Sequence, residues 1–197
     1  MSTLHSVPSA GSATPITIGL AGLAVVSPAA FAADYLTEAE ALASFFPGAA
    51  TIERELALVD EPASIELRRG RTPRHLFRHV ARDAAGAVLG YAVVDDVMGK
   101  ARPITYLLAI DAAGEVLGIE VLVYRESHGH EISREAFRRQ FIGKDAADRL
   151  KLDGDIRNIS GATISCRSIT DGVADLLDLQ AAIPAATSSV TEPVEAS

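Results

Sequence analysis

Hydrophobic and polar residues alternate along the middle of this chain and recur with helical spacing near its end. The alternation is clearest over 104–110 and 116–124, and the turn residues of 111–114 between them predict that these two segments form a β-hairpin. Three further segments have the same extended character: 52–59, 76–81 and 88–94. The pattern therefore predicts an antiparallel sheet.

Two longer helices are predicted, one on each side of these strands in the sequence. Thr37 and Glu40 form a capping box, and the helix that they begin is expected to run to Phe45-Phe46, before Pro47-Gly48. From Ile164 to Gln180 the apolar residues recur with a helical period, so this segment is expected to pack one face against a core.

Shorter helical pieces are predicted between the last strand and the final helix. Ser133 is expected to cap a short helix that reaches Phe141 and ends at Gly143, and a further helical turn is expected over 146–150. The predicted fold class is α+β, with a single domain in which helices flank a twisted antiparallel sheet.

Composition restricts the function more than the fold. The chain has 197 residues, 48% of them hydrophobic, and a net charge of −8, which allows one domain with a substantial core and argues against nucleic acid as a partner. Its single cysteine, Cys166, cannot form an internal disulfide, and it is predicted to be a small buried residue rather than a reactive thiol.

The amino-terminal segment differs in composition from the rest. An apolar run over 16–26 is followed by Pro28 and by the small-x-small pattern Ala30-Phe31-Ala32, so 1–32 is predicted to be a signal peptide and the protein to be exported to the periplasm. No Lys or Arg precedes the run, and an uncleaved membrane anchor is the alternative. Residues 181–197 are predicted to be a disordered tail.

The entry to the final helix carries the candidate chemistry. Amide groups in the first turn of a helix attract anions, and Gly161 lets the backbone approach a ligand without an intervening β-carbon. The run Ser160-Gly161-Ala162-Thr163 therefore predicts a phosphate site beside two hydroxyls. The alternative is that Ser160 or Thr163 only caps the helix.

This run, with Asp155 upstream of it, resembles the flavinylation motif of the FMN-binding domain family. The family includes the G subunit of Rnf complexes, the C subunit of the sodium-pumping NADH:quinone oxidoreductase and small exported flavoproteins. Further landmarks follow the family's order: Gly90-Tyr91, 97–100, 103–106, 111–114, 124–127, 140–144 and Ile164-Ser165. The resemblance covers 35–180, which is the predicted FMN-binding domain.

The resemblance implies a covalently attached flavin. FMN would be joined to Thr163 through a phosphoester made by a flavin transferase, which requires Mg and consumes FAD as the donor. By the same resemblance, two groups of residues would bind the cofactor. The phosphate group comprises Asp155, Ser160, Gly161, Ala162, Ile164 and Ser165, and the loop against the isoalloxazine ring comprises Glu126, Ser127 and Gly129.

The function implied is electron relay from a membrane or periplasmic donor to an acceptor, rather than catalysis by a stand-alone enzyme. The chain has no Gly-x-Ser-x-Gly elbow, no Cys-x-x-Cys-His and no dinucleotide fingerprint, so no catalytic residue is assigned. Two alternatives stay open. One is reversible binding of FMN or another ligand, and the other is periplasmic metal binding through His128 and His130, which alone supply only part of a coordination shell.

A basic stretch between 68 and 82 has two interpretations. It contains six arginines and two histidines within fifteen residues, namely Arg68, Arg69, Arg71, Arg74, Arg78, Arg82, His75 and His79. It is either a solvated strand and turn face or a positive patch, which would dock an acidic redox partner or hold the substrate of the transferase.

Overall fold

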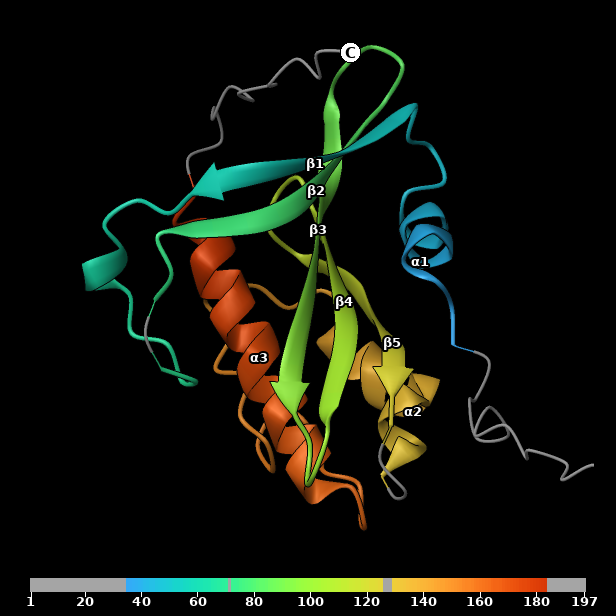
Figure 1. Ribbon diagram of the computed structural model, residues 1–197, viewed down its shortest axis with the longest axis vertical. Helices are drawn as coiled ribbons and strands as arrows, with labels where there is room; N and C mark the ends of the chain where they lie inside the picture. Colours follow the sequence, from blue (N-terminus) through green and yellow to red (C-terminus); the bar gives the residue numbers. More distant parts are fainter. Residues whose placement is uncertain (1–34, 71, 126–128, 184–197) are drawn as a thin grey trace, which may run out of the picture. The chain divides into compact units, whose positions relative to one another are not determined.

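The computed structural model describes residues 35–70, 72–125 and 129–183. Its centre is one five-stranded antiparallel sheet, in which the strands follow each other in chain order (Figure 1). The strands are β1 (Thr51–Leu58), β2 (His75–Arg82), β3 (Val88–Met98), β4 (Pro103–Asp111) and β5 (Val116–Tyr124). The five predicted strands and the antiparallel, α+β fold class are confirmed, and β3 runs four residues beyond its predicted end.

The sheet is twisted, and irregularities in its register contribute to the twist. Register shifts occur between Ala81 and Arg82 in β2 and at two places in β4. Such bulges increase the local twist of a strand pair. As a result, β1 and β2 cross steeply over the direction of β3, β4 and β5 (Figure 1).

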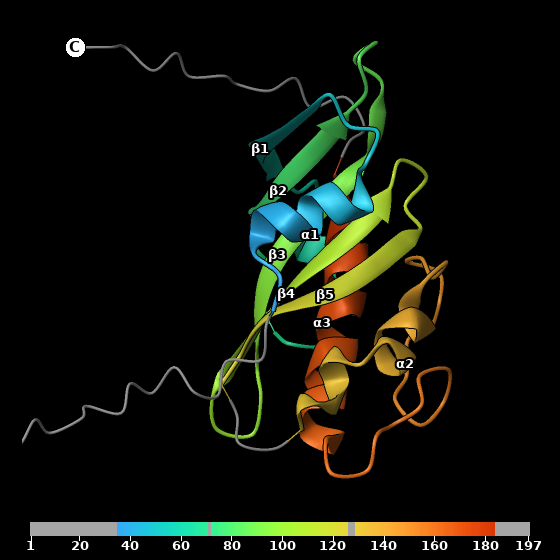
Figure 2. The same cartoon turned by 90° about the vertical axis from the view of Figure 1, so that its right-hand side faces the viewer.

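Each face of the sheet is covered by one helix, and Figure 2 shows α1 (Glu38–Phe45) and α3 (Thr163–Ala181) on opposite sides of the strands. The alternation of the strands explains the two layers, because neighbouring residues of a strand point to opposite faces. Buried side chains such as Leu108 and Ile110 belong to the core under α3, whereas Leu107 and Ala109 belong to the core under α1.

The capping box of α1 is confirmed. The Thr37 hydroxyl accepts a hydrogen bond from the amide of Glu40 at 3.3 Å, and the Glu40 carboxylate accepts one from the amide of Thr37 at 2.8 Å. Phe45 then packs so closely on the sheet that a β-carbon at Gly118 would lie 2.5 Å from its ring. The helix thus covers a band of the sheet where small residues leave room for aromatic rings.

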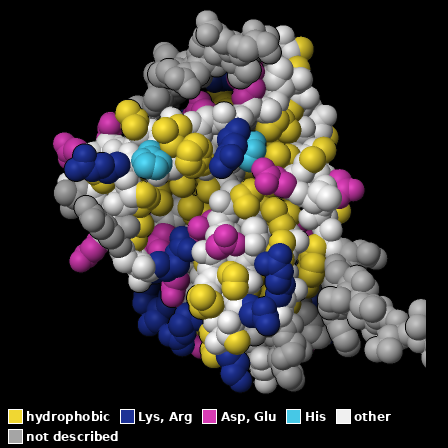
Figure 3. All heavy atoms as spheres, in the orientation of Figure 1, with side chains coloured by type: hydrophobic (Ala, Val, Ile, Leu, Met, Phe, Trp, Pro, Cys, Tyr) yellow, Lys and Arg dark blue, Asp and Glu magenta, His cyan; other side chains and the backbone are white. Residues whose placement is uncertain are grey.

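Beyond α1, the same face of the sheet is exposed along β1 and β2. Leu56 and Phe77 are paired across the two strands and are each 50% exposed, and Leu58 is 60% exposed. Figure 3 shows hydrophobic side chains at the surface over this strand pair. The sheet is therefore fully covered only where α1 and α3 pack on it.

The segment from 129 to 158 connects β5 to α3 and corrects two predictions. Its helical pieces are His130–Ser133, α2 (Glu135–Arg138) and Arg139–Phe141, and Gly143 follows with a φ of 74°. Ser133 ends the first piece and does not cap α2, which has no side-chain cap. The helical turn predicted over 146–150 is absent: 146–148 form a turn, in which the Asp148 carboxylate accepts hydrogen bonds from the Asp145 amide and the Lys144 ammonium group.

The final helix agrees with its prediction to within one residue at each end. Packing continues past it, since Ile183 is buried in the core. The predicted signal peptide and residues 184–197 of the predicted tail lie outside the described residues. No helix in the described ranges is both long and apolar enough to cross a bilayer.

Candidate functional site

The candidate site is built around the amino-terminal end of α3. A turn runs from Ile159 to Ala162, closed by a 3.0 Å hydrogen bond between their backbone groups, and Gly161 adopts a φ of 88° within it. That conformation is readily accessible to glycine and strained for other residues. The glycine therefore turns the chain sharply into the first residue of the helix, Thr163.

No side chain caps this helix. Its N-cap is Ala162, and no side-chain hydrogen bond is made there. Within the described part of the chain, the amides of Thr163, Ile164 and Ser165 also have no acceptor, and the first helical bond is donated by Cys166. The alternative that Ser160 or Thr163 caps the helix is therefore wrong. The end of α3 leaves donors that attract an anion.

The Thr163 hydroxyl lies at the surface and has one described partner. The Asn158 side-chain amide donates a hydrogen bond to Thr163 Oγ1 at 3.1 Å. The other end of the same amide, Asn158 Oδ1, is buried and has no hydrogen-bond partner among the described residues. A buried acceptor without a partner is uncommon and is a candidate contact for a ligand donor.

Asn158 was missed by sequence reasoning, which selected Asp155 instead. Asp155 is exposed and lies in the turn between Leu152 and Ile156. The pKa of Lys144 is raised mainly by its hydrogen bond to Asp148, and the charge of Asp155 adds to this. One feature of the sequence could have pointed to Asn158: it lies two residues before Ser160, in the segment that leads directly into the turn.

Two predicted parts of the site come together in the structure. Gly129, which follows β5, lies so close to the start of α3 that a β-carbon on it would be 2.6 Å from Tyr124 Oη, 3.4 Å from Ser165 Oγ and 3.6 Å from Ala162 Cα. Its φ of 88° also favours glycine. Glu126 and Ser127, which were assigned to the same loop, lie outside the described residues.

The remaining predicted residues of the phosphate group divide into exposed and buried ones. Ser160 and Gly161 are exposed, and Ile164 is 50% exposed, so the turn and the outer side of the helix are open to a ligand. Ala162 and Ser165 are buried, with exposed fractions of 3% and 4%. These two positions shape the backbone against Gly129 rather than offer a surface.

Cys166 is the buried residue that the sequence predicted. It is fully covered in the core, and burial raises the pKa of its thiol. A thiol with a raised pKa is a poor nucleophile at neutral pH. The chemistry at this end of α3 therefore rests on the Thr163 hydroxyl and the backbone amides.

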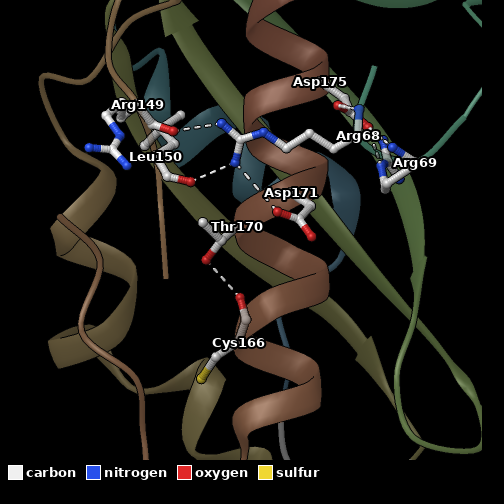
Figure 4. A network of polar contacts seen from close by, with 8 residues as sticks. All are labelled: Arg68, Arg69, Arg149, Leu150, Cys166, Thr170, Asp171 and Asp175. Atoms are coloured by element: carbon white, nitrogen blue, oxygen red, sulfur yellow. Dashed lines mark hydrogen bonds and ion pairs between the residues drawn. The ribbon is translucent and has the colours of Figure 1, made fainter. Parts of the chain in front are cut away.

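The basic stretch contributes to a network along the middle of α3, shown in Figure 4. Asp175 has a fully buried carboxylate that accepts hydrogen bonds from the amide of Arg68 at 2.7 Å, from the amide of Arg69 at 3.1 Å and from Arg69 Nε at 2.9 Å. Arg69 also pairs with Asp95 at 2.8 Å. These contacts join the segment before β2 to both α3 and β3.

The guanidinium group of Arg68 extends the same network to the segment before the candidate site. It donates to the carbonyl oxygens of Arg149 and Leu150, both at 2.6 Å, and lies 3.4 Å from Asp171 (Figure 4). Tyr106 lies beneath, and its hydroxyl donates to Asp95 at 3.1 Å. Burial, and then the charge of Asp95, raise the pKa of Tyr106 well above its ordinary value, so it stays a neutral donor.

The arginines of the basic stretch therefore do not form one uniform surface patch. Arg78, with only 3% of its surface exposed, pairs with Glu55 at 2.7 Å and stacks over Tyr91. Arg68, Arg69 and Arg78 pair with carboxylates of this chain, while the exposed Arg74 has no ion pair in the described ranges. Neither of the two sequence interpretations describes the three paired arginines, because the acidic partners are distant in sequence.

Among the described residues, no group of three His, Cys, Asp or Glu side chains could hold a metal ion. His128 and the side chain of His130, on which the metal alternative depended, are outside the part that can be described. The features that can be examined instead suit an anionic group such as a phosphate. They are the donor amides of α3, the close approach at Gly129, the positive φ of Gly161, the surface hydroxyl of Thr163 and the unpaired amide oxygen of Asn158.

Comparison with known proteins agrees with this site. The profile of the family described as FMN-binding domain matches residues 99–178, a range that contains β4, β5, Gly129 and the turn into α3. The resemblance drawn from the sequence is thereby confirmed for these residues.

One curated relative and one solved structure are also similar. The G subunit of the ion-translocating oxidoreductase complex of Stutzerimonas stutzeri is 32% identical over 108 residues, which cover 49% of this chain and 47% of that protein. The chain thus spans about half the length of this relative. The crystal structure of Shewanella oneidensis NqrC covers 66% of this chain and 79% of its own, with 13% identity and a TM-score of 0.48.

Proposed function

We propose that this chain carries FMN, bound covalently through a phosphoester to Thr163, and that it relays electrons between redox partners. The observation that carries the proposal is the start of α3, where an exposed hydroxyl stands beside three helix amides that have no described acceptor. The family match over 99–178 and the similarity to the G subunit of an ion-translocating oxidoreductase complex support the same conclusion.

The residues around Thr163 have distinct roles in this proposal. The amides of Thr163, Ile164 and Ser165 would hold the phosphate, because they are donors at the positive end of a helix. Asn158 would orient the hydroxyl through its 3.1 Å hydrogen bond. Gly129 keeps the chain after β5 close to the helix, where the ring would be covered.

FMN supplies the redox chemistry when it is bound, and the protein supplies its position and its surroundings. A covalent link has a physical advantage for an exported protein, since a dissociated cofactor would be lost outside the cytoplasm. No side chain at the site is assigned as a general acid or base. Thr163 is the point of attachment.

The attachment itself is a phosphoryl transfer that needs FAD and a flavin transferase with Mg. The Thr163 oxygen forms a bond to the FMN phosphorus of FAD, the bond between that phosphorus and the bridging oxygen breaks, and AMP leaves with the pair of electrons. The hydroxyl proton is released in the same step. The protein gains the mass of FMN minus water, and no oxidant or reductant is needed.

The location and the partners follow from the same proposal. Residues 1–32 would export the chain, or anchor it to the membrane, and the donor and acceptor would be redox proteins of the membrane or the periplasm. The apolar run over 16–26 and the similarity to part of an ion-translocating oxidoreductase complex support this part.

The test is the intact mass of the exported protein after expression with and without a flavin transferase, followed by peptide mapping across 155–167. We expect a gain of FMN minus water on Thr163, dependent on the transferase and absent in Thr163→Ala. Thr51→Ala is the matched control, because it removes an exposed threonine hydroxyl at the start of β1, outside the predicted site, and should keep the modification. An unmodified peptide despite an active transferase would overturn covalent attachment and leave reversible binding, which equilibrium dialysis with FMN would detect.

A further inference from the structure

We propose that the end of the molecule around Thr163 is a positively charged docking surface for a redox partner with an acidic face. The inference rests on the proposed function, since a flavin on Thr163 would lie at the centre of this surface. It uses side chains that the attachment does not need.

Three exposed cations contribute to this surface. Lys100 lies in the turn between β3 and β4, Arg157 lies before the turn that contains Ser160, and Arg167 lies in the second turn of α3. None of the three forms an ion pair with any carboxylate in the described ranges. No carboxylate of the described residues therefore lies within ion-pair distance of these charges.

Each of the three is tied to the surroundings of Thr163 by an observed contact or by helix geometry. Arg167 is four residues after Thr163, so both lie on the same face of α3. The Ser168 hydroxyl donates to the carbonyl oxygen of Met98 at 2.7 Å, which holds the turn with Lys100 beside this part of the helix. Arg157 directly precedes Asn158, the partner of Thr163.

Two exposed carboxylates lie in the same part of the molecule. Asp153 and Asp155 form no ion pair among the described residues, whereas Asp171 pairs with Arg68. The three cations therefore outnumber the two unpaired carboxylates. Figure 3 shows Lys and Arg side chains prevailing over Asp and Glu in the lower part of the view, where Figure 1 has the β3–β4 turn and the start of α3.

This arrangement is opposite in sign to the chain as a whole, whose net charge is −8. A negative protein with a positive end orients an approaching acidic partner toward that end, because the rest of its surface repels the partner. A flavin exchanging electrons at this end would thus select a partner with an acidic docking face. The exchange would slow as the ionic strength rises, since salt screens such steering.

The first experiment needs no flavin. Paramagnetic relaxation of the backbone amides of 163–168 is measured in the flavin-free protein with two nitroxides of similar size, carboxy-PROXYL and aminomethyl-PROXYL, and the amides of 54–58 serve as the reference. We expect the anionic probe to relax 163–168 at least about threefold more than the cationic probe, the ratio that a local potential of about half a kT produces for two opposite unit charges. Equal relaxation, or stronger relaxation by the cation, would overturn the inference.

The second experiment uses the flavinylated protein after reduction with dithionite. Each FMN hydroquinone gives two electrons to two ferricyanide ions or to two hexaammineruthenium(III) ions, and the released protons go to the buffer. We expect the rate ratio of ferricyanide to hexaammineruthenium to fall about tenfold in Arg157→Glu/Arg167→Glu, the size that such local potentials produce. The control Arg54→Glu/Arg74→Glu makes the same charge change at β1 and β2 and should stay within about twofold.

These experiments distinguish a failure of the proposed attachment from a failure of the docking surface. If Thr163 carries no flavin but the nitroxides report a positive surface, the proposed attachment fails and the surface stands. If the flavin is attached and the rate ratio of the Arg157 and Arg167 double variant is unchanged, the docking surface is wrong. The docking surface would also be wrong if the double variant carried less flavin but kept the parent's ratio of ferricyanide to hexaammineruthenium rates. In that case Arg157 and Arg167 would serve recognition by the transferase.

Discussion

The middle of α3 and its amino-terminal end serve different purposes. Around Gly172 and Asp175 the helix is buried, and the Asp175 carboxylate accepts hydrogen bonds from two backbone amides and a guanidinium group. At the amino-terminal end Thr163 and Ile164 are exposed, no side chain caps the helix, and three amides have no described acceptor. The contacts that stabilise the helix are thus concentrated in its middle, and the donors at its start are available to a ligand. Substitutions in these two regions should therefore separate stability from cofactor attachment.

The largest effect on stability is expected from Asp175→Ala. It would leave the amides of Arg68 and Arg69 and the guanidinium of Arg69 without their buried acceptor, and removing one partner of a buried ion pair costs about 3–5 kcal/mol. Urea unfolding at neutral pH measures the loss. Asp171→Asn is the control, because that pair is partly exposed and is worth at most about 1 kcal/mol. If both variants lost the same small free energy of unfolding, the buried network would not be what stabilises the middle of α3.

A smaller loss is expected from Gly172→Ala. The added β-carbon would lie 2.6 Å from Tyr106 Oη and 2.8 Å from Val97 Cγ1, where the helix packs on the sheet. Overpacking of this kind costs about 1–3 kcal/mol, which outweighs the gain in helix propensity of about 1 kcal/mol. Gly48→Ala is the matched control, because the nearest atom there is 3.9 Å away. A stabilised Gly172→Ala would mean that the helix and the sheet have room to separate.

Much of this fold could be predicted from the sequence because it depends on local patterns. Strand alternation, the Thr37 capping box and the period of α3 are each contained in a few neighbouring residues. The turn at Gly161 was recognised for the same reason. The network of Asp175 could not be predicted, since its partners are more than 100 residues away in sequence.

The site was predicted in part, and the reason for the rest is again physical. Gly129 and Ser165 come together as expected, because both flank the same end of the helix. Asp155 was selected by the resemblance to the family's motif, but in the structure it is exposed and Asn158 is the residue that contacts the Thr163 hydroxyl. The prediction that Ser133 caps the next helix was wrong for a similar reason, because Ser133 is the last residue of the separate helical turn His130–Ser133.

Asn158→Ala should affect the cofactor more than the fold. Loss of one hydrogen bond with a net value of about 1 kcal/mol should slow the appearance of the flavin mass roughly three- to tenfold under limiting transferase. The free energy of unfolding should change by no more than about 1 kcal/mol. Asn158→Asp keeps an oxygen that can accept the hydroxyl proton and should retain at least the parent rate. An unchanged rate in Asn158→Ala would remove Asn158 from the site.

The smallest effect on stability is expected from Thr163→Ala. This variant tests most directly the difference between the start of α3 and its middle. If Thr163 capped α3, its loss would cost about 1 kcal/mol, as for Thr37→Ala in the true capping box of α1. The structure gives Thr163 no capping bond, so Thr163→Ala should stay within about 0.5 kcal/mol of the parent in urea while it removes the flavin mass completely. A hydroxyl that the fold does not need, at a helix end with unpaired donors, is then explained by its reaction with a phosphate. A loss of unfolding free energy equal to that of Thr37→Ala would instead make Thr163 a structural residue. The start of α3 would then not differ in this respect from its middle.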